Sequence, residues 1–371
     1  MREDPGGPTV KGVKTPPRLD DLPPLLTPRR IFEQLSRWVV GQERAKRALS
    51  IAAYNHLKRT ALRRARRGTP GIRKSNVLLV GPTGCGKTHL ARTLAQILDV
   101  PFHVADATEF TEAGYYGKDV EAIIAELLAK AGQSVEEAQR GIVFIDEVDK
   151  IARRSQAQRA GVGARDIGGE GVQQALLKIL EGRELVVPLG PALQWQRHEQ
   201  VTVDTTDVLF VCAGTFTDVF AYSGAARALG FGAGDPRRAG ARRVRQKDLV
   251  DYGMLAEFLG RLPVVVQLEE LGEAELLEVL TGPPDAVVRE VKELLSADGV
   301  ELAFTEGALR EIVRHALERG AGARGLRAIV EEVVADLLFE APERAGTRAC
   351  VDAPFVRRRV DRIDPGALAE P

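Results

Sequence analysis

The spacing of hydrophobic residues predicts an alternation of strands and helices through the first two thirds of the chain. Short apolar runs predict buried strands at 76–80, 100–105, 141–146 and 208–212. Stretches with apolar residues every three or four positions predict helices at 88–98, 120–131 and 172–180. Strands that alternate with helices in this way indicate a parallel sheet covered by helices on both faces.

Helical patterns also lie on both sides of this region. Residues 31–59 have helical spacing with a break near 39–41, and Thr27 before Pro28 is a typical helix start. Beyond residue 263 the pattern predicts a smaller, mostly helical domain. Its expected helices lie at 273–280, 286–295, 306–317 and 326–338, with short strands at 300–304 and 349–351.

The two ends of the chain have a different composition, which sets the expected domain limits. The first 26 residues are rich in proline and poor in apolar residues, and residues 353–371 are rich in Arg and Pro. Such segments bury too little apolar surface to fold by themselves, so we expect a disordered arm and a fraying tail. The expected domains are therefore 27–265 and 266–352.

Composition narrows the class of protein. The 371 residues include 52 Lys or Arg and 52 Asp or Glu, and this zero net charge argues against a dedicated nucleic-acid binder. Cys85, Cys212 and Cys350 are too far apart for a zinc finger or a disulfide scaffold. There is no apolar signal region and no run long enough for a membrane span, so we expect a cytoplasmic protein.

Residues 81–88 fit the phosphate-binding pattern GxxxxGK[ST], between a predicted strand and a predicted helix. Glycines let backbone N–H groups converge on phosphate oxygens, and the helix N-terminus adds partial positive charge. Lys87 is expected to reach the β- and γ-phosphates of ATP, and Thr88 to coordinate Mg²⁺. The alternative is a glycine-rich turn without a ligand. The residues assigned to nucleotide contact here are Gly81, Pro82, Thr83, Gly84, Cys85, Gly86, Lys87 and Thr88.

Two carboxylates end the predicted strand at 141–146, at the edge of the sheet where ligands bind in open α/β folds. Asp146 is expected to hold Mg²⁺, directly or through water, and Glu147 to orient or deprotonate the attacking water. Two ordinary surface carboxylates are the alternative.

Cys85 lies beside Lys87 at a helix N-terminus, and both features lower a thiol pKa. We hypothesise that its modification blocks ATP binding, unless it is only a small residue tolerated in the loop.

Longer stretches resemble the ClpX family of AAA+ ATPases, over about residues 27–350. The similar segments are 39–42, 107–117, 139–141, 169–178, 257–263 and 322–327. Members of that family are ATP-driven unfoldase rings that feed the ClpP peptidase. The resemblance implies an α/β AAA+ domain followed by a mostly helical C-terminal lid domain. It also implies ATP and Mg²⁺ as ligands, a homohexamer, a ClpP-type peptidase partner, and unfolded or tagged proteins as substrates.

The resemblance assigns further residues to the nucleotide site. It places Val40 near adenine and extends the nucleotide-binding set to His89. It makes Arg261 an arginine finger that enters the site of the neighbouring subunit, a group that stabilises transition-state charge. It also places Arg324, from the lid domain, on the γ-phosphate of its own subunit. The alternative for either arginine is a surface salt bridge.

Other loops resemble those by which the family holds substrate and peptidase. They comprise Tyr115 and Tyr116 in a main pore loop, Arg165 and Asp166 in a second, Arg197 and His198 at the pore entrance, and Leu229, Gly230 and Phe231 for peptidase docking. A tyrosine face grips an unfolded chain without reading its sequence. The alternatives are a packed tyrosine pair, solvated turns, and a Leu-Gly-Phe loop folded back on its own subunit.

The sequence departs from the family pattern in three places. Residues 1–25 lack the four cysteines of the family's zinc module, so we expect that module to be absent. Tyr116 replaces a usual small aliphatic residue, and the pore-entrance pattern is reduced to 196–198. Two other functions also stay open: a chaperone that acts without a peptidase, if residues 229–231 do not dock, and a nucleic-acid motor on the same ATPase core.

Overall fold

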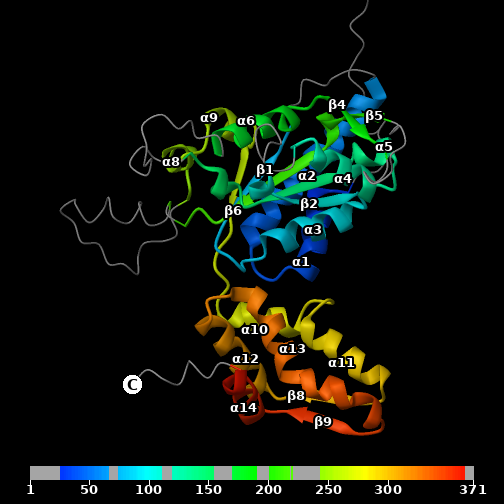
Figure 1. Ribbon diagram of the computed structural model, residues 1–371, viewed down its shortest axis with the longest axis vertical. Helices are drawn as coiled ribbons and strands as arrows, with labels where there is room; N and C mark the ends of the chain where they lie inside the picture. Colours follow the sequence, from blue (N-terminus) through cyan, green and yellow to red (C-terminus); the bar gives the residue numbers. More distant parts are fainter. Residues whose placement is uncertain are drawn as a thin grey trace, which may run out of the picture.

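The computed structural model describes residues 26–66, 74–110, 119–153, 169–189, 200–217, 219 and 243–363. Figure 1 shows a larger domain built around a sheet and a smaller domain of helices below it, joined by the chain that leaves strand β7. No described helix has both the length and the apolar character that a membrane crossing requires.

A five-stranded parallel sheet forms the centre of the larger domain, with the order β2-β3-β6-β1-β7. Its strands are β1 (Val77–Val80), β2 (Phe102–Asp106), β3 (Ile142–Asp146), β6 (Leu209–Gly214) and β7 (Val264–Gln267). The predicted parallel α/β fold is confirmed. The edge strand β7 was not predicted, although its sequence begins with three valines, of which Val266 is buried. It also extends past the domain limit expected at residue 265.

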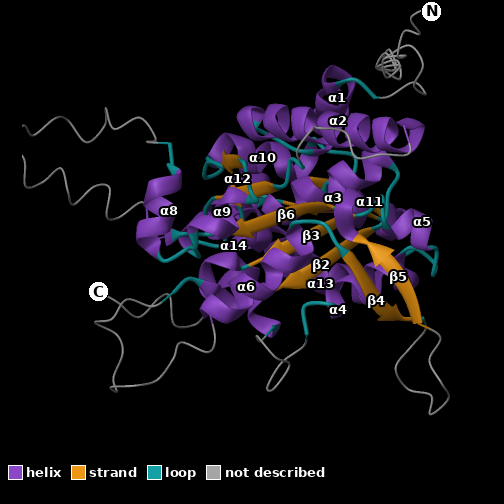
Figure 2. Cartoon of the chain, turned by 90° about the horizontal axis from the view of Figure 1, so that it is seen from above, coloured by secondary structure: helices purple, strands orange, loops and turns teal. Residues whose placement is uncertain are grey.

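Helices cover both faces of this sheet (Figure 2). Alternate strand residues point to opposite faces, so Leu79 and Phe144 share one core cluster while Leu78 and Ile145 share the other. The first face packs against α1 (Pro28–Trp38), α2 (Glu43–Arg66) and α3 (Lys87–Leu98). The second packs against α4 (Ala122–Lys130), α6 (Gly169–Leu180), α8 (Gln246–Tyr252) and α9 (Ala256–Gly260).

Short elements connect these layers. They are the helix α5 (Val135–Ala138), the antiparallel hairpin β4 (Glu184–Pro188) and β5 (Gln200–Asp204), and the 3₁₀ turns η2 (Ala107–Glu109), η3 (Val148–Ile151) and η5 (Thr205–Asp207). At the start of α1, the Thr27 side chain accepts a hydrogen bond from Arg30 N at 3.3 Å, which confirms the predicted helix start. The cap satisfies an amide that has no partner within the helix.

The fully buried side chain of Gln173 joins three elements of the second face. Its Nε2 donates to the carbonyl oxygen of Ile151 at 2.7 Å, and its Oε1 accepts from the amide of Leu255 at 2.8 Å. The helix α6 is thereby tied to η3, which follows β3, and to the residue that precedes α9. Because each end of the amide is satisfied, the buried polar group stabilises the arrangement instead of straining it.

A buried cluster of charges fixes α2 to the end of the sheet away from residues 81–88. Arg59 donates to the carbonyl of Thr206 at 2.7 Å and lies 3.3 Å from Asp207. Arg63 contacts Asp207 at 2.7 Å, so one carboxylate serves both guanidinium groups. His56 is buried beside this cluster; burial, aided by the positive charges of Arg59 and a nearby lysine, lowers its pKa to about 3.

The smaller domain has one apolar core. Its elements are α10 (Glu273–Thr281), α11 (Val287–Ala297), β8 (Glu301–Phe304), α12 (Glu306–Glu318), α13 (Gly322–Glu340), η7 (Ala341–Glu343), β9 (Arg348–Val351) and α14 (Ala353–Ile363). The expected fraying tail is wrong for residues 353–363, which form α14. Val356 and Val360 are buried, and Arg357 Nε lies 2.8 Å from Glu311 of α12. The many arginines of this segment hid its apolar spacing.

Candidate nucleotide site

The predicted phosphate loop forms the turn between β1 and α3. Gly84 and Gly86 have positive φ angles of 76° and 94°, which L side chains rarely adopt. Lys87, the first residue of α3, is buried, and its ammonium donates to the carbonyls of Gly81 and Pro82 at 2.7 and 2.8 Å. The ammonium is therefore held over the loop beside the α3 N-terminus, where a phosphate would be attracted.

The hydroxyl of Thr88, in the first turn of α3, lies near two carboxylate residues at the end of β3. Thr88 Oγ1 donates to Asp146 Oδ2 at 3.3 Å, and the amide of Glu147 donates to Asp146 Oδ1 at 2.9 Å. These oxygen ligands suit Mg²⁺, which binds carboxylates beside a substrate phosphate. Glu147 has a φ of 57°, a left-handed conformation that costs a non-glycine residue about 1–2 kcal/mol. Strain of this kind persists where the surrounding structure enforces it, commonly at functional sites.

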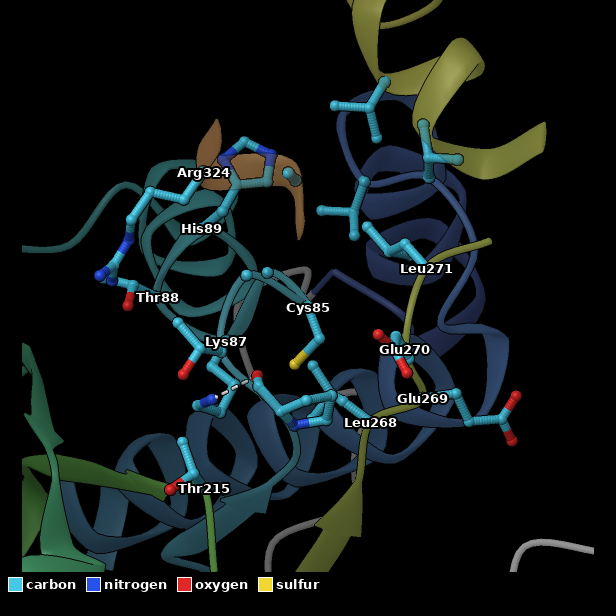
Figure 3. Close-up of a pocket in the computed structure, with 18 of the residues that line it drawn as sticks. Cys85, Lys87, Thr88, His89, Thr215, Leu268, Glu269, Glu270, Leu271 and Arg324 are labelled. Atoms are coloured by element: carbon cyan, nitrogen blue, oxygen red, sulfur yellow. Dashed lines mark hydrogen bonds between the residues drawn. The ribbon is translucent and has the colours of Figure 1, made fainter. Parts of the chain in front are cut away.

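A cavity of about 1050 Å³ opens between this loop and the smaller domain (Figure 3). Its wall includes the following predicted site residues: Val40, Pro82, Thr83, Gly84, Cys85, Gly86, Lys87, Thr88, His89, Asp146, Glu147 and Arg324. Gly81 is not among the residues that line the cavity, but its carbonyl holds Lys87. The structure thus brings together residues from the loop after β1 and from β3, α3 and α13 around one cavity.

The smaller domain contacts the phosphate loop through backbone. The amide of Ala323 donates to the carbonyl of Gly84 at 3.2 Å. A Cβ on Gly322, whose φ is 54°, would lie 3.2 Å from both Cα and O of Gly84. A side chain at either glycine would therefore separate the two segments.

The two predicted arginines occupy different places. Arg324 lines the cavity and makes no ion pair with any residue that the structure describes, whereas Arg327 one turn later is paired with Glu290 at 2.6 Å. Arg261 does not line the cavity. Its guanidinium contacts Glu181 at 2.6 Å, and both side chains are about half exposed.

Comparison with known proteins identifies the fold family. Residues 72–265 match the AAA domain (Cdc48 subfamily), and residues 271–348 match the C-terminal, D2-small domain of ClpB protein. The chain is 47% identical over 317 residues to "ATP-dependent Clp protease ATP-binding subunit ClpX 2" of Wolinella succinogenes, covering 85% of this chain and 78% of that protein. It is 41% identical over 351 residues to "ATP-dependent Clp protease ATP-binding subunit ClpX" of Treponema denticola, covering 92% and 84%. The chain belongs to the ClpX family. Its pairing of an AAA ATPase domain with a lid domain confirms the predicted fold class.

Sequence reasoning missed three polar residues around the ClpX-type site. Thr215, just after β6, donates to the buried Asp149 at 2.8 Å, and both line the cavity. Gln42 holds Glu269, at the exit of β7, by donating to its carbonyl at 2.7 Å and accepting from its amide at 3.0 Å. Asp149 and Thr215 follow adjacent strands, so strand order could have indicated their approach. The contact of Gln42 had no signal, because 227 residues separate the partners.

The prediction of an activated thiol at Cys85 is wrong. The side chain is buried, with Sγ packed against Gly81. Burial raises the pKa of Cys85, and the nearby charge of Lys87 offsets this only in part. The neutral thiol is therefore favoured, as expected for a small residue that fills space in the loop.

The loops that the ClpX resemblance assigns to substrate and peptidase lie outside the described residues. They include Tyr115, Tyr116, Arg165, Asp166, Arg197, His198, Leu229, Gly230 and Phe231. No group of three or more metal-ligating side chains occurs among the residues that the structure describes.

Proposed function

We propose that this chain is an ATP-driven protein unfoldase that assembles as a homohexameric ring and passes substrates to a ClpP-type peptidase. The observation that carries the proposal is the cavity shared by the two domains. It places Lys87, Thr88 and Asp146 opposite Arg324 in a chain that belongs to the ClpX family. The names of its relatives, subunits of an ATP-dependent Clp protease, support the peptidase partner.

The residues around the cavity have distinct proposed roles. Lys87 exchanges its loop carbonyls for the β- and γ-phosphates of ATP, and Thr88 and Asp146 hold Mg²⁺. Bound Mg²⁺ neutralises phosphate charge. Glu147, an exposed residue directly after Asp146, orients or deprotonates the attacking water. Arg324 contacts the γ-phosphate from the lid, so loss of that phosphate changes the angle between the domains.

Arg261 is proposed to act on the nucleotide of a neighbouring subunit. Its carbonyl accepts a hydrogen bond from the Asn76 side chain at 3.1 Å, at the N-terminal end of β1. The phosphate loop follows the other end of this four-residue strand, ~13 Å away at about 3.3 Å per residue. That separation keeps Arg261 from its own nucleotide and supports a role at a contact between subunits.

The loops beyond the described residues complete the proposal through the resemblance. Tyr115 and Tyr116 grip the substrate, the loops around 165–166 and 197–198 line the pore, and residues 229–231 dock on the peptidase. Repeated strokes need only overcome the local stability of the substrate, whose total is about 5–15 kcal/mol.

Degradation of a folded, tagged fluorescent protein tests the whole proposal. With ATP and ClpP, fluorescence should be lost and peptides should appear. Glu147→Gln should bind nucleotide but stop both signals, because the attacking water loses its base. Glu184→Gln, which removes an exposed carboxylate of the β4–β5 hairpin, is the matched control.

Other outcomes select the alternatives. Loss of fluorescence without peptides would favour a chaperone that acts without a peptidase. Strong stimulation of ATP hydrolysis by duplex DNA would favour a nucleic-acid motor. Protein unfolding that survives Tyr115→Ala would refute the proposed grip of Tyr115 on the substrate. Full activity of Glu147→Gln would refute the assigned chemistry.

A further inference from the structure

Glu181 lies where it fixes the direction of the Arg261 guanidinium. Glu181 directly follows the last residue of α6, and Arg261 directly follows α9. Arg261 donates to the same oxygen, Glu181 Oε1, from Nε at 2.9 Å and from Nη2 at 2.6 Å. Two bonds to one carboxylate oxygen fix the plane of the guanidinium, which a single bond would leave free to rotate.

The backbone on both sides of this pair is held by one buried amide. Asn76, which is 1% exposed, donates through Nδ2 to the carbonyls of Leu180 and Arg261 at 3.3 and 3.1 Å. Its Oδ1 accepts from the amide of Phe210 at 3.3 Å, which anchors it to the centre of the sheet. The residue before Glu181 and Arg261 itself are therefore fixed relative to each other, and only the two side chains are left to be ordered.

The guanidinium keeps enough donors to bind a second anion while it stays on Glu181. Arginine has five N–H groups, and Glu181 engages one on Nε and one on Nη2. Both hydrogens of Nη1 and one of Nη2 are left. With about half of the side chain exposed, this free edge can meet a phosphate oxygen without breaking the ion pair.

We propose that Glu181 is a positioning residue for Arg261, and that it orients the guanidinium toward the phosphates of ATP bound by a neighbouring subunit. This inference rests on the proposed role of Arg261 in that subunit contact. Its physical basis is preorganisation, since a donor already aimed at the developing charge does not have to be ordered during the reaction. The position of Glu181 at the end of α6 also links Arg261 to the helix that follows the proposed second pore loop.

Steady-state ATP hydrolysis by the assembled protein tests the proposal. Glu181→Ala should lower kcat about two- to fivefold, the range that an exposed ion pair supports, with the KM for ATP unchanged. Glu181→Gln keeps an oxygen acceptor without the charge and should lie between Glu181→Ala and the wild type. Glu184→Gln, three residues away and without an ion pair in the described part of the chain, should match the wild type.

A double-mutant cycle separates positioning from a general structural effect. Arg261→Ala should lower kcat strongly, and Glu181→Ala should add no further loss in that background, measured with radiolabelled ATP so that slow hydrolysis stays detectable. An equal loss in both backgrounds would overturn the proposal, as would no change in kcat for Glu181→Ala. A rise in kcat would show that Glu181 restrains Arg261 and would also overturn it. If Arg261→Ala itself leaves kcat unchanged, the proposed role of Arg261 fails instead.

Discussion

Replacing Gly322 by alanine should weaken nucleotide binding by separating the lid domain from the phosphate loop. Gly322 starts α13 with a φ of 54°, and its added Cβ would lie 3.2 Å from Cα and O of Gly84 and 3.3 Å from its C atom. These are backbone atoms and cannot rotate away. Gly320 offers a matched control, because its φ is 61° and an added Cβ meets nothing within 4 Å.

The difference between the two variants isolates the contact between domains. Both substitutions impose a left-handed alanine, at a cost of about 1–2 kcal/mol. Gly322→Ala must also lengthen the hydrogen bond from Ala323 N to Gly84 O, which is 3.2 Å in the structure. A typical hydrogen bond contributes about 0.5–1.5 kcal/mol. We therefore expect Gly322→Ala to bind nucleotide about two- to tenfold more weakly than Gly320→Ala.

Titration with a fluorescent, slowly hydrolysed ATP analogue measures this ratio directly. Thermal unfolding of the two variants checks that the left-handed alanine costs the lid domain a similar amount in both. Equal nucleotide affinities for Gly320→Ala and Gly322→Ala would refute the reasoning. That result would mean that the Gly84–Gly322 contact does not contribute to nucleotide binding in the cavity.

Two buried ionisable groups and a pair of thiols give further expected outcomes. His56 has a folded pKa of about 3 against 6.5 in the unfolded chain, so stability is fully present above pH 6.5 and declines as the pH falls toward 3. The loss at pH 5 should be about 2 kcal/mol in urea unfolding, and His56→Leu should abolish it. Burial raises the pKa of Glu311, but the hydrogen bonds from Arg314 and Arg357 have the larger combined effect and lower it to about 2. Glu311→Gln should therefore lower the free energy of unfolding by about 1–3 kcal/mol in the same assay. Iodoacetamide should alkylate the exposed Cys350 well before the buried Cys85, as measured by mass spectrometry.

Each of these outcomes has a result that contradicts it. A pH dependence that is the same with and without His56 would mean that another group takes up the proton on unfolding. Glu306→Gln, at an exposed pair on the same helix as Glu311, should change the free energy of unfolding little. An equal loss of stability in both variants would show that the buried pair contributes no more than the exposed one. Modification of Cys85 at the rate of Cys350 would contradict its burial.

The parts of the site that local sequence could predict are those in which one segment carries the whole arrangement. The phosphate loop needs a buried strand, two left-handed glycines and a helix start, and all of these lie between residues 77 and 88. Asp146 and Glu147 were found for the same reason, since they end an apolar run. These features follow from spacing and glycine geometry, without knowledge of distant contacts.

The parts that could not be predicted depend on contacts between distant segments. Gln42 meets Glu269 only because α2 and β7 pack together. Arg261 meets Glu181 only because α6 and α9 pack together. For Cys85, the local pattern of a helix N-terminus and a lysine indicated a lowered pKa, but burial outweighs both effects. Local charge is visible in a sequence, whereas desolvation requires the fold.

The buried side-chain amide of Gln173 couples the segment that follows Glu147 to the segment that leads to Arg261. One of its bonds holds Ile151, four residues after Glu147, and the other holds Leu255, six residues before Arg261. A displacement of either segment must carry the other with it or break a buried hydrogen bond. In a ring of the proposed kind, each copy would form a stiff link between its own phosphate site and that of its neighbour. A displacement at one site would then be transmitted to the next site around the ring.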